Sequence, residues 1–91
     1  MPQVKFLPYT IQTSRKVLKQ LEKLPLHVKR RFEEILKILK NYPVPIFKYD
    51  VKKMKGYENV YRVRIGEYRL IYHVKGKKIH LLGISHRKKS I

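Results

Sequence analysis

The sequence lacks cysteine, has few acidic residues and contains no long apolar run. Without cysteine, neither disulfide bonds nor zinc sites with thiolate ligands are available, as fits a reducing cytoplasm. No segment approaches the roughly 20 apolar residues of a membrane-spanning helix, and the N-terminal MPQVKFLPYT lacks the pattern of a signal peptide. We therefore expect a cytoplasmic protein that does not enter a membrane.

The scarcity of acid leaves a large positive charge. There are 23 lysines and arginines but only 6 aspartates and glutamates, so the formal net charge is +17. Such a charge destabilises the compact state by self-repulsion and attracts polyanions. Nucleic acid, an anionic membrane or an acidic protein could each exploit it, whereas a thermophile-type surface would mix lysine with glutamate. Among these, the charge favours nucleic acid.

The first 25 residues predict a strand and a helix within a single domain that spans residues 1–91. The run VKFL ahead of Pro8 is typical of a short strand. Thr10, Thr13 and Ser14 then offer side-chain oxygens of the kind that begin helices. Apolar residues recur at helical spacing up to Pro25, namely Ile11, Val17, Leu18, Leu21 and Leu24.

A second helix is predicted from Leu26 to Tyr42. One apolar stripe runs along it, formed by Val28, Phe32, Ile35, Leu36 and Leu39. Pro43 and Pro45 end the helix, because proline lacks the amide donor and disfavours helical geometry in the residue before it. The two helices are therefore expected to form a hairpin.

From Lys48 onward the apolar period changes from about 3.6 to 2, which indicates strands. YDVKKMKGY predicts a weak strand or loop, and VYRVRI, YRLIYHV and KIHLLGIS predict strands. The last three are joined by Gly66-Glu67 and Gly76-Lys77, and a glycine in the first loop position suits a type II′ hairpin. The predicted fold class is α+β, with an N-terminal strand, a two-helix hairpin and a three- to four-stranded antiparallel meander that packs on the helices with one face.

VYRVRI and YRLIYHV, joined by Gly66-Glu67, form what we call the central hairpin. Alternation along its two strands separates apolar from cationic side chains. If Gly66-Glu67 is the whole turn, Ile65 lies opposite Tyr68, and Arg64 and Arg69 become direct cross-strand neighbours. The face toward the helices then comprises Tyr61, Val63, Ile65, Tyr68, Leu70, Tyr72 and Val74. The opposite face carries Val60, Arg62, Arg64, Arg69, Ile71 and His73.

No acidic residue of these strands lies among the three arginines, since Glu67 is in the turn and Glu58 precedes the first strand. Like charges that face each other across a strand pair are destabilising, and the planar guanidinium matches phosphate. The three arginines are thus either an ordinary solvated face or an unpaired site for phosphate.

The same register, extended through Gly76-Lys77, adds His80, Leu82 and Ile84 to the arginine side. The aliphatic members form an apolar strip that either a partner or the C-terminal tail covers. His73 and His80 become cross-strand neighbours, but two histidines without a carboxylate are a weak metal signal. We therefore expect neither a metal nor another cofactor.

The residue types leave RNA cleavage without a metal open as a chemistry for this face. The sequence offers no paired carboxylates and no glycine-rich phosphate loop, whereas RNA supplies its own nucleophile, the 2′-hydroxyl. Cleavage then requires a base, cations around the scissile phosphate and an acid for the leaving oxygen. His86 and Arg87 end the last strand, and histidine transfers protons near neutral pH. An ordinary exposed histidine beside a basic tail fits His86 equally well.

The segment KKMKGYENVYRVRIGEYRLIYHVKGKKIHLLGISHRKKSI resembles the RelE/ParE toxin superfamily, and its RelE branch more closely. The most diagnostic pieces are MKGYENVYRVRIGEYRLIY and, after it, HRKKSI. The resemblance implies a microbial-ribonuclease-like fold and an archaeal or bacterial toxin that cleaves mRNA in the ribosomal A site. The 2′-hydroxyl attacks and leaves a cyclic phosphate and a free 5′-hydroxyl. A RelB-like antitoxin is implied as the partner that wraps and neutralises the toxin.

The resemblance also implies roles for the arginines. Arg62 and Arg64 match the basic pair of the family's central strand, in which one residue serves as base or charge stabiliser. Arg69 matches the arginine that stabilises the phosphate. Arg87 matches the late-strand arginine that holds the phosphate and the transition state.

Further roles are implied for one histidine and three lysines. His86 stands where some members carry a histidine beside the late arginine. Lys53 and Lys55 match basic positions that contact RNA, and the adjacent Lys52 is assigned to the same group.

The chain departs from the family in its proton carriers. Arginine occupies both central-strand positions, and a side chain that stays protonated is a poor general base. Many members carry a tyrosine a few residues after the late arginine, whereas residues 88–91 contain none. Proton transfer is left to His86, to the absent tyrosine or to the ribosome.

Three functions stay open on these grounds. The first is a ribosome-dependent mRNA endonuclease, which HRKK and the three arginines favour. The second is a ParE-like toxin that inhibits gyrase by binding, without RNA chemistry. The third is a basic nucleic-acid-binding module with no toxicity, such as a ribosomal protein.

Overall fold

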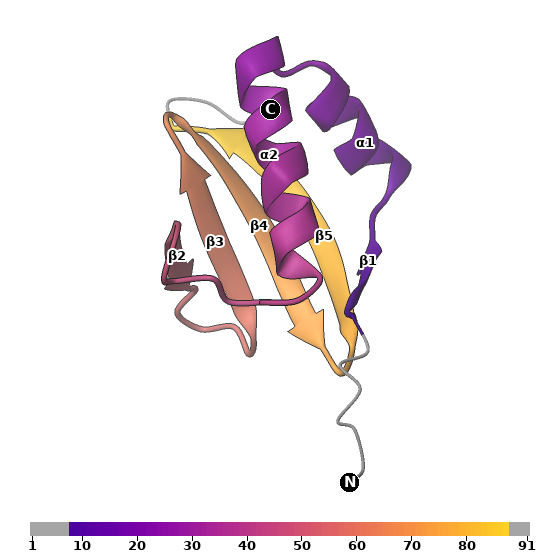
Figure 1. The fold of residues 1–91 in the computed structure, drawn as a ribbon, viewed down its shortest axis with the longest axis vertical. Coiled ribbons are helices and arrows are strands. Elements are labelled where there is room, and N and C mark those ends of the chain that lie inside the picture. Colours follow the sequence, from indigo (N-terminus) through magenta and orange to yellow (C-terminus); the bar gives the residue numbers. More distant parts are fainter. Residues whose placement is uncertain (1–7, 88–91) are drawn as a thin grey trace, which may run out of the picture.

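Two helices cover one face of a five-stranded sheet in this computed structural model, which describes residues 8–87 (Figure 1). Along the chain the elements are β1 (Thr10–Gln12), α1 (Arg15–Glu22), α2 (Leu26–Leu39), β2 (Asp50–Lys53), β3 (Val60–Ile65), β4 (Tyr68–Lys75) and β5 (Lys78–His86). The strand order is β1-β5-β4-β3-β2, with β1 parallel to β5 and all other pairs antiparallel. The predicted α+β class, with a helical hairpin before an antiparallel meander, is confirmed.

The first strand lies later in the sequence than the residues that predicted one. The run VKFL, residues 4–7, lies outside the described residues, whereas Thr10–Gln12 pairs with the start of β5. Assigning Ile11 to the first helix is therefore wrong, because Ile11 pairs with Ile79 and packs on the core from a strand. The helix begins after Ser14, whose extended backbone and side-chain oxygen, 3.2 Å from the Val17 amide, form the predicted cap.

Both helices bury one side against the sheet. The core residues they contribute are Val17, Leu21, Val28, Phe32, Ile35 and Leu39, and Leu24 joins them from the turn between the helices. Helix α2 ends at Leu39 rather than at the predicted Tyr42, although the Tyr42 amide still donates to the Ile38 carbonyl at 2.9 Å. Among the described residues, neither helix is long and apolar enough to cross a membrane.

The central hairpin has the predicted register. Ile65 pairs with Tyr68 and Arg64 with Arg69, around a turn in which Gly66 has a φ of +56°. A positive φ at the first turn position is what a type II′ turn requires, and glycine adopts it without strain. As a result, Val63, Leu70 and Tyr72 face the helices and are fully buried.

The register between β4 and β5 shifts by one residue. His73 pairs with His80 and Tyr72 with Leu81, but Ile71 then pairs with Gly83, so that Leu82 is the extra residue of a β-bulge. Beyond the bulge every β5 side chain changes face relative to an unbroken register. Placing Ile84 on the arginine side is therefore wrong, since Ile84 pairs with Leu70 and is buried in the core.

Two side-chain hydrogen bonds tie the layers together. The Ile84 amide donates to Gln20 Oε1 at 3.1 Å, so a buried glutamine of α1 meets β5 just after the bulge. The Tyr72 hydroxyl donates to the Pro43 carbonyl at 2.7 Å and joins β4 to the segment that follows α2.

Candidate functional site

Strands β3 and β4 place three arginines on the sheet face that points away from the core. Arg62 and Arg64 alternate with the buried Val63 along β3, and Arg64 lies directly opposite Arg69 of β4. We call Arg62, Arg64 and Arg69 the arginine cluster. Their common face confirms the prediction from the turn and the alternation.

The three arginines differ in exposure. The Arg62 side chain is only 11% exposed, whereas that of Arg64 is 45% exposed. Arg69 is half-buried, and its Nε donor is buried with no hydrogen-bond partner within the described part of the chain. An unpaired buried donor is costly unless an acceptor reaches it, so this atom is suited to an anionic ligand.

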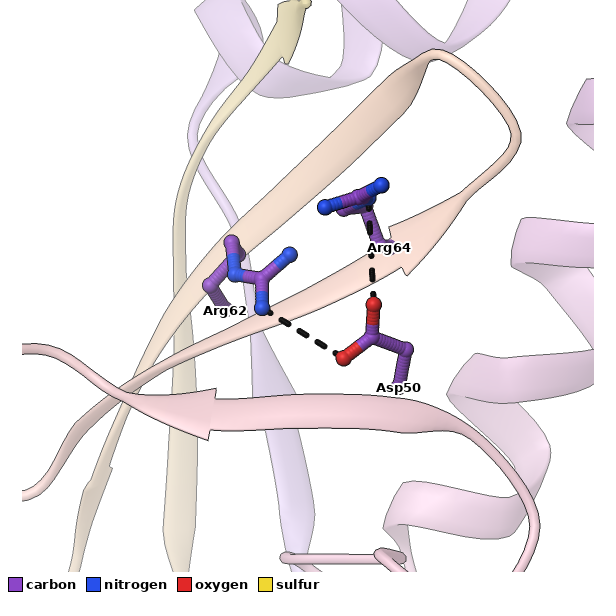
Figure 2. Close-up of polar contacts among 3 residues, drawn as sticks. All are labelled: Asp50, Arg62 and Arg64. Carbon is purple, nitrogen blue, oxygen red and sulfur yellow. Dashed lines mark hydrogen bonds and ion pairs between the residues drawn. The ribbon is translucent and has the colours of Figure 1, made fainter.

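An aspartate from the edge strand joins the arginine cluster (Figure 2). Asp50 of β2 pairs with Arg64 in the sheet, and its Oδ1 accepts from Arg62 Nη2 at 3.4 Å. Its Oδ2 lies 3.8 Å from Arg64 Nε. Two of the three arginines therefore have an acidic partner, which differs from the alternative in which all three are unpaired.

The aspartate was missed because β2 was predicted only as a weak strand or loop. Its register with β3 continues the meander outward and places Asp50 beside Arg64 and Lys52 beside Arg62. An alternation count extended back across the loop before β3 could have found this acid.

Pairing across the sheet aligns two rows on the arginine side. One row runs through Asp50, Arg64, Arg69 and Ser85, and the other through Lys52, Arg62, Ile71 and Gly83. Ser85 was not predicted as part of the site, and it comes to this face because of the β-bulge. The first row carries polar side chains throughout, whereas the second is cationic only at Lys52 and Arg62, so an anion can bind where these cations lie.

The three lysines predicted to bind RNA differ in where they lie relative to the arginine cluster. Lys52 shares the face of the arginine cluster, whereas Lys53 pairs with Tyr61 and lies on the other face of β2. Lys55 is exposed in the loop before β3. Only Lys52 is therefore next to the arginines in the sheet.

His86 lies on the opposite face of the sheet from the arginine cluster. It pairs with Tyr68, and the two rings meet edge to face with centroids 4.9 Å apart. Its Nε2 is 3.2 Å from Glu67 Oε2, and its side chain is 16% exposed. Arg87 follows at the surface, and its backbone amide donates to the Glu67 carbonyl at 2.6 Å.

His73 and His80 are cross-strand neighbours, as predicted, with ring centroids 6.1 Å apart. His73 is four residues beyond Arg69 on the same side of β4, about 13 Å away at the rise of a strand. Within residues 8–87, no three histidine, aspartate or glutamate side chains gather in a way that could hold a metal ion. The chemistry that the arginine side offers is anion binding and charge stabilisation.

Comparison with known proteins gives consistent matches. Residues 11–91 match the family described as the ParE toxin of the type II toxin-antitoxin system parDE. A relative named putative toxin RelE1, from Methanocaldococcus jannaschii, is 40% identical over 66 residues, which are 72% of this chain and 73% of the relative. Toxin RelE3 of the same organism is 38% identical over 72 residues, or 78% and 82% of the two chains.

Solved structures agree with the sequence relatives. A chain of the archaeal RelE–RelB complex from Pyrococcus horikoshii has 39% sequence identity and a TM-score of 0.79, over 88% of this chain and 96% of that chain. A chain of the RelB–RelE antitoxin–toxin complex from Methanococcus jannaschii has 34% identity and a TM-score of 0.74, over 84% and 89%.

Proposed function

The chain belongs to the RelE/ParE superfamily of type II toxins, and we propose that it is a ribosome-dependent mRNA endonuclease of the RelE type. It cleaves mRNA in the ribosomal A site through attack of the RNA's own 2′-hydroxyl. The products are a cyclic phosphate and a free 5′-hydroxyl.

The observation that carries this proposal is the arginine cluster. Arg64 and Arg69 face each other across two strands, and the buried Nε of Arg69 has no acceptor within residues 8–87. Attack by the 2′-hydroxyl builds negative charge on the scissile phosphate, and fixed cations stabilise that charge without a metal. Guanidinium groups are suited to this task because they can donate two parallel hydrogen bonds to phosphate oxygens.

The residues act in different ways in this proposal. Arg62, Arg64 and Arg69 bind the phosphate and stabilise its charge, and Arg87 reaches the same phosphate from the end of β5. Lys52, Lys53 and Lys55 contact the RNA backbone along the β2 edge. His86 lies on the opposite face of the sheet, beside Glu67, so proton transfer at this phosphate is proposed to fall to the ribosome, and substitution of His86 tests this separately.

The partner proposed for the free toxin is a RelB-like antitoxin. The two solved relatives described above are complexes of RelE with RelB. A surplus of 17 positive charges favours association with an acidic protein as well as with RNA. The proposal treats residues 1–91 as one toxin domain that acts in the cytoplasm, where ribosomes and mRNA are found.

Cleavage of mRNA on programmed ribosomes, mapped by toeprinting, tests the proposed activity. The wild-type protein should cut mRNA only when ribosomes are present. Arg69→Ala and Arg87→Ala should each reduce the cleavage rate by about 100-fold, the usual effect of removing one group that stabilises transition-state charge. Arg30→Ala removes the same charge from an exposed position on α2 and should leave the rate unchanged.

Two outcomes would contradict the proposal. Full activity in folded Arg69→Ala and Arg87→Ala proteins would overturn the site assignment. Absence of ribosomal cleavage together with inhibition of gyrase would replace the endonuclease with a ParE-like toxin, the alternative that the matched family description favours.

A further inference from the structure

The carboxylate of Asp50 bridges two members of the arginine cluster. One oxygen faces Arg62 Nη2 at 3.4 Å, and the other faces Arg64 Nε at 3.8 Å (Figure 2). A phosphodiester likewise presents two anionic oxygens to its ligands. The two Asp50 oxygens therefore contact Arg62 and Arg64 as the two oxygens of a bound phosphate would, and they do so from the β2 side of the arginines.

The burial of Arg62 explains why an acidic residue is needed at position 50. Its side chain is 11% exposed, and a guanidinium so far removed from water is destabilising unless an anion accompanies it. Arg64 lies two residues away on the same face, about 7 Å at the rise of a strand, and adds a like charge. An acid between the two arginines reduces their repulsion and limits the orientations of both guanidinium groups.

The contacts of Asp50 are long enough to leave both arginines available to a ligand. Charge-assisted hydrogen bonds are usually about 2.7–2.9 Å, shorter than both distances to Asp50. The Asp50 side chain is also 51% exposed, so solvent weakens its hold on the arginines. Asp50 therefore orients the arginines without occupying all their donors.

The row across the sheet indicates where the ligand binds. Asp50, Arg64 and Arg69 follow one another on β2, β3 and β4. The acid is therefore on one side of Arg64, and on the other is Arg69, whose Nε has no acceptor within residues 8–87. A phosphate between Arg64 and Arg69 contacts two cations and leaves Asp50 in place behind them. The buried Nε of Arg69 is the donor this phosphate satisfies.

We propose that Asp50 is a positioning residue for the arginine cluster, which fixes Arg62 and Arg64 for phosphate binding and at the same time weakens that binding by its negative charge. This inference rests on the proposed function, because it takes the phosphate to be that of mRNA. It predicts opposite effects of Asp50 on affinity and on rate, which a purely structural ion pair would not produce.

Single-turnover cleavage of mRNA on programmed ribosomes measures both effects. Asp50→Asn keeps the shape of the side chain and removes its charge. We expect the rate at saturating toxin to fall about tenfold, because the guanidinium groups lose their orienting acceptor. The toxin concentration at half-maximal rate should fall about threefold, because repulsion between Asp50 and the phosphate is removed.

Glu34→Gln is the matched control. It removes one negative charge from another partly exposed ion pair, in which Glu34 Oε1 lies 3.8 Å from Lys48 Nζ. This variant should keep the wild-type rate. If Asp50→Asn behaves like Glu34→Gln, or if its saturating rate and its affinity both decrease, the proposal is overturned.

A titration with inorganic phosphate tests the positioning role without RNA cleavage. NMR signals of the arginine Nε–H groups report binding at Arg64 and Arg69 directly. Phosphate should bind Asp50→Asn about threefold more tightly than wild type, and the Arg62 and Arg64 signals of the unliganded variant should broaden or shift. Equal phosphate affinity in the two proteins overturns the role of Asp50, whatever happens on ribosomes.

The two experiments separate this proposal from the proposed function. A wild-type protein that fails to cut mRNA, but whose phosphate affinity rises in Asp50→Asn, retains the positioning role and loses the endonuclease function. A protein that cuts mRNA and shows no effect of Asp50 on rate or phosphate binding keeps the function and loses the positioning role.

Discussion

The two faces of the β3–β4 hairpin differ in polarity and charge although their residues alternate along the same strands. On one face Val63, Leu70 and Tyr72 are fully buried beneath the helices. On the other face lies the arginine cluster, with one acid among three cations. Neighbouring residues along either strand therefore alternate between core positions, which stabilise the fold, and charged positions on the other face.

This separation keeps the charge of the arginine cluster apart from the apolar core. The helix-facing side is apolar, so the free energy of burial does not depend on the charges behind it. The arginine side contributes little to the core and is free to keep unbalanced charge for a ligand. Mutations on the two faces should therefore affect different measurements.

The largest expected effect is that of Leu70→Ala on the helix-facing side. Leu70 is buried between Val63 and Ile84, so truncation should lower the free energy of unfolding by about 3 kcal/mol. The cleavage rate per folded molecule should not change. Urea denaturation, together with single-turnover cleavage at a temperature where the variant is folded, checks both statements.

The adjacent Arg69→Ala is the control for that comparison. It removes a buried donor that has no acceptor within residues 8–87, so it should not lower the free energy of unfolding as Leu70→Ala does, while it reduces cleavage. The separation of the two faces would be refuted if Arg69→Ala destabilised the protein as much as Leu70→Ala does.

A smaller effect is expected at Gln20, whose side chain meets β5 where the register has just shifted. Gln20→Met keeps the length of the side chain and removes the acceptor for the Ile84 amide. A buried donor that loses its acceptor costs about 1–3 kcal/mol, so we expect a loss of about 2 kcal/mol. Hydrogen exchange at the Ile84 amide should accelerate.

The Gln20→Met variant also tests the β-bulge, which determines which β5 residues lie on which face of the sheet. Ile84 faces the core and Ser85 the arginine side only while the shifted register holds. Unchanged exchange at Ile84 in a folded Gln20→Met protein would show that the bulge forms without Gln20.

The smallest effect is expected for Tyr72→Phe, which removes the hydrogen bond to the Pro43 carbonyl. At neutral pH the variant should be about 1 kcal/mol less stable than wild type. Burial, with a lesser contribution from the nearby Tyr61, raises the pKa of Tyr72. The neutral phenol is therefore favoured in the folded state, and its contribution is present below the unfolded pKa of about 10.

As the pH rises above that value, wild type should lose this contribution whereas Tyr72→Phe has no hydroxyl to titrate. The difference in stability between the two proteins should shrink and then reverse. Urea denaturation of both at pH 7 and at about pH 10.5 measures the difference, and a gap that stays constant contradicts the role of Tyr72 burial.

The central hairpin could be predicted from the sequence because its turn and its alternation are local. Gly66 supplies the positive φ and fixes the register, which in turn places Arg64 opposite Arg69. The remaining differences come from contacts between distant residues. Ile11 has helical spacing to its neighbours, but pairing with Ile79 determines that it lies in a strand.

The candidate site was predictable only in part for the same reason. Alternation alone gives no sign of the extra residue Leu82, so Ile84 was expected on the wrong face and Ser85 was not expected in the site. Asp50 lies in a four-residue edge strand with little apolar pattern, and only its pairing with β3 reveals that it joins the arginines.

The position of β5 inside the sheet has a consequence for the order of events during synthesis. β5 lies between β1 and β4, although all the other described elements precede it in the chain. A nascent chain must therefore expose its helices and most of its sheet until residues 78–86 have emerged from the ribosome. Only then can Ile79, Leu81 and Ile84 complete the core and Ser85 come to lie beside Arg69. Vectorial translation thus delays both the native fold and the finished arginine surface until the last strand is made.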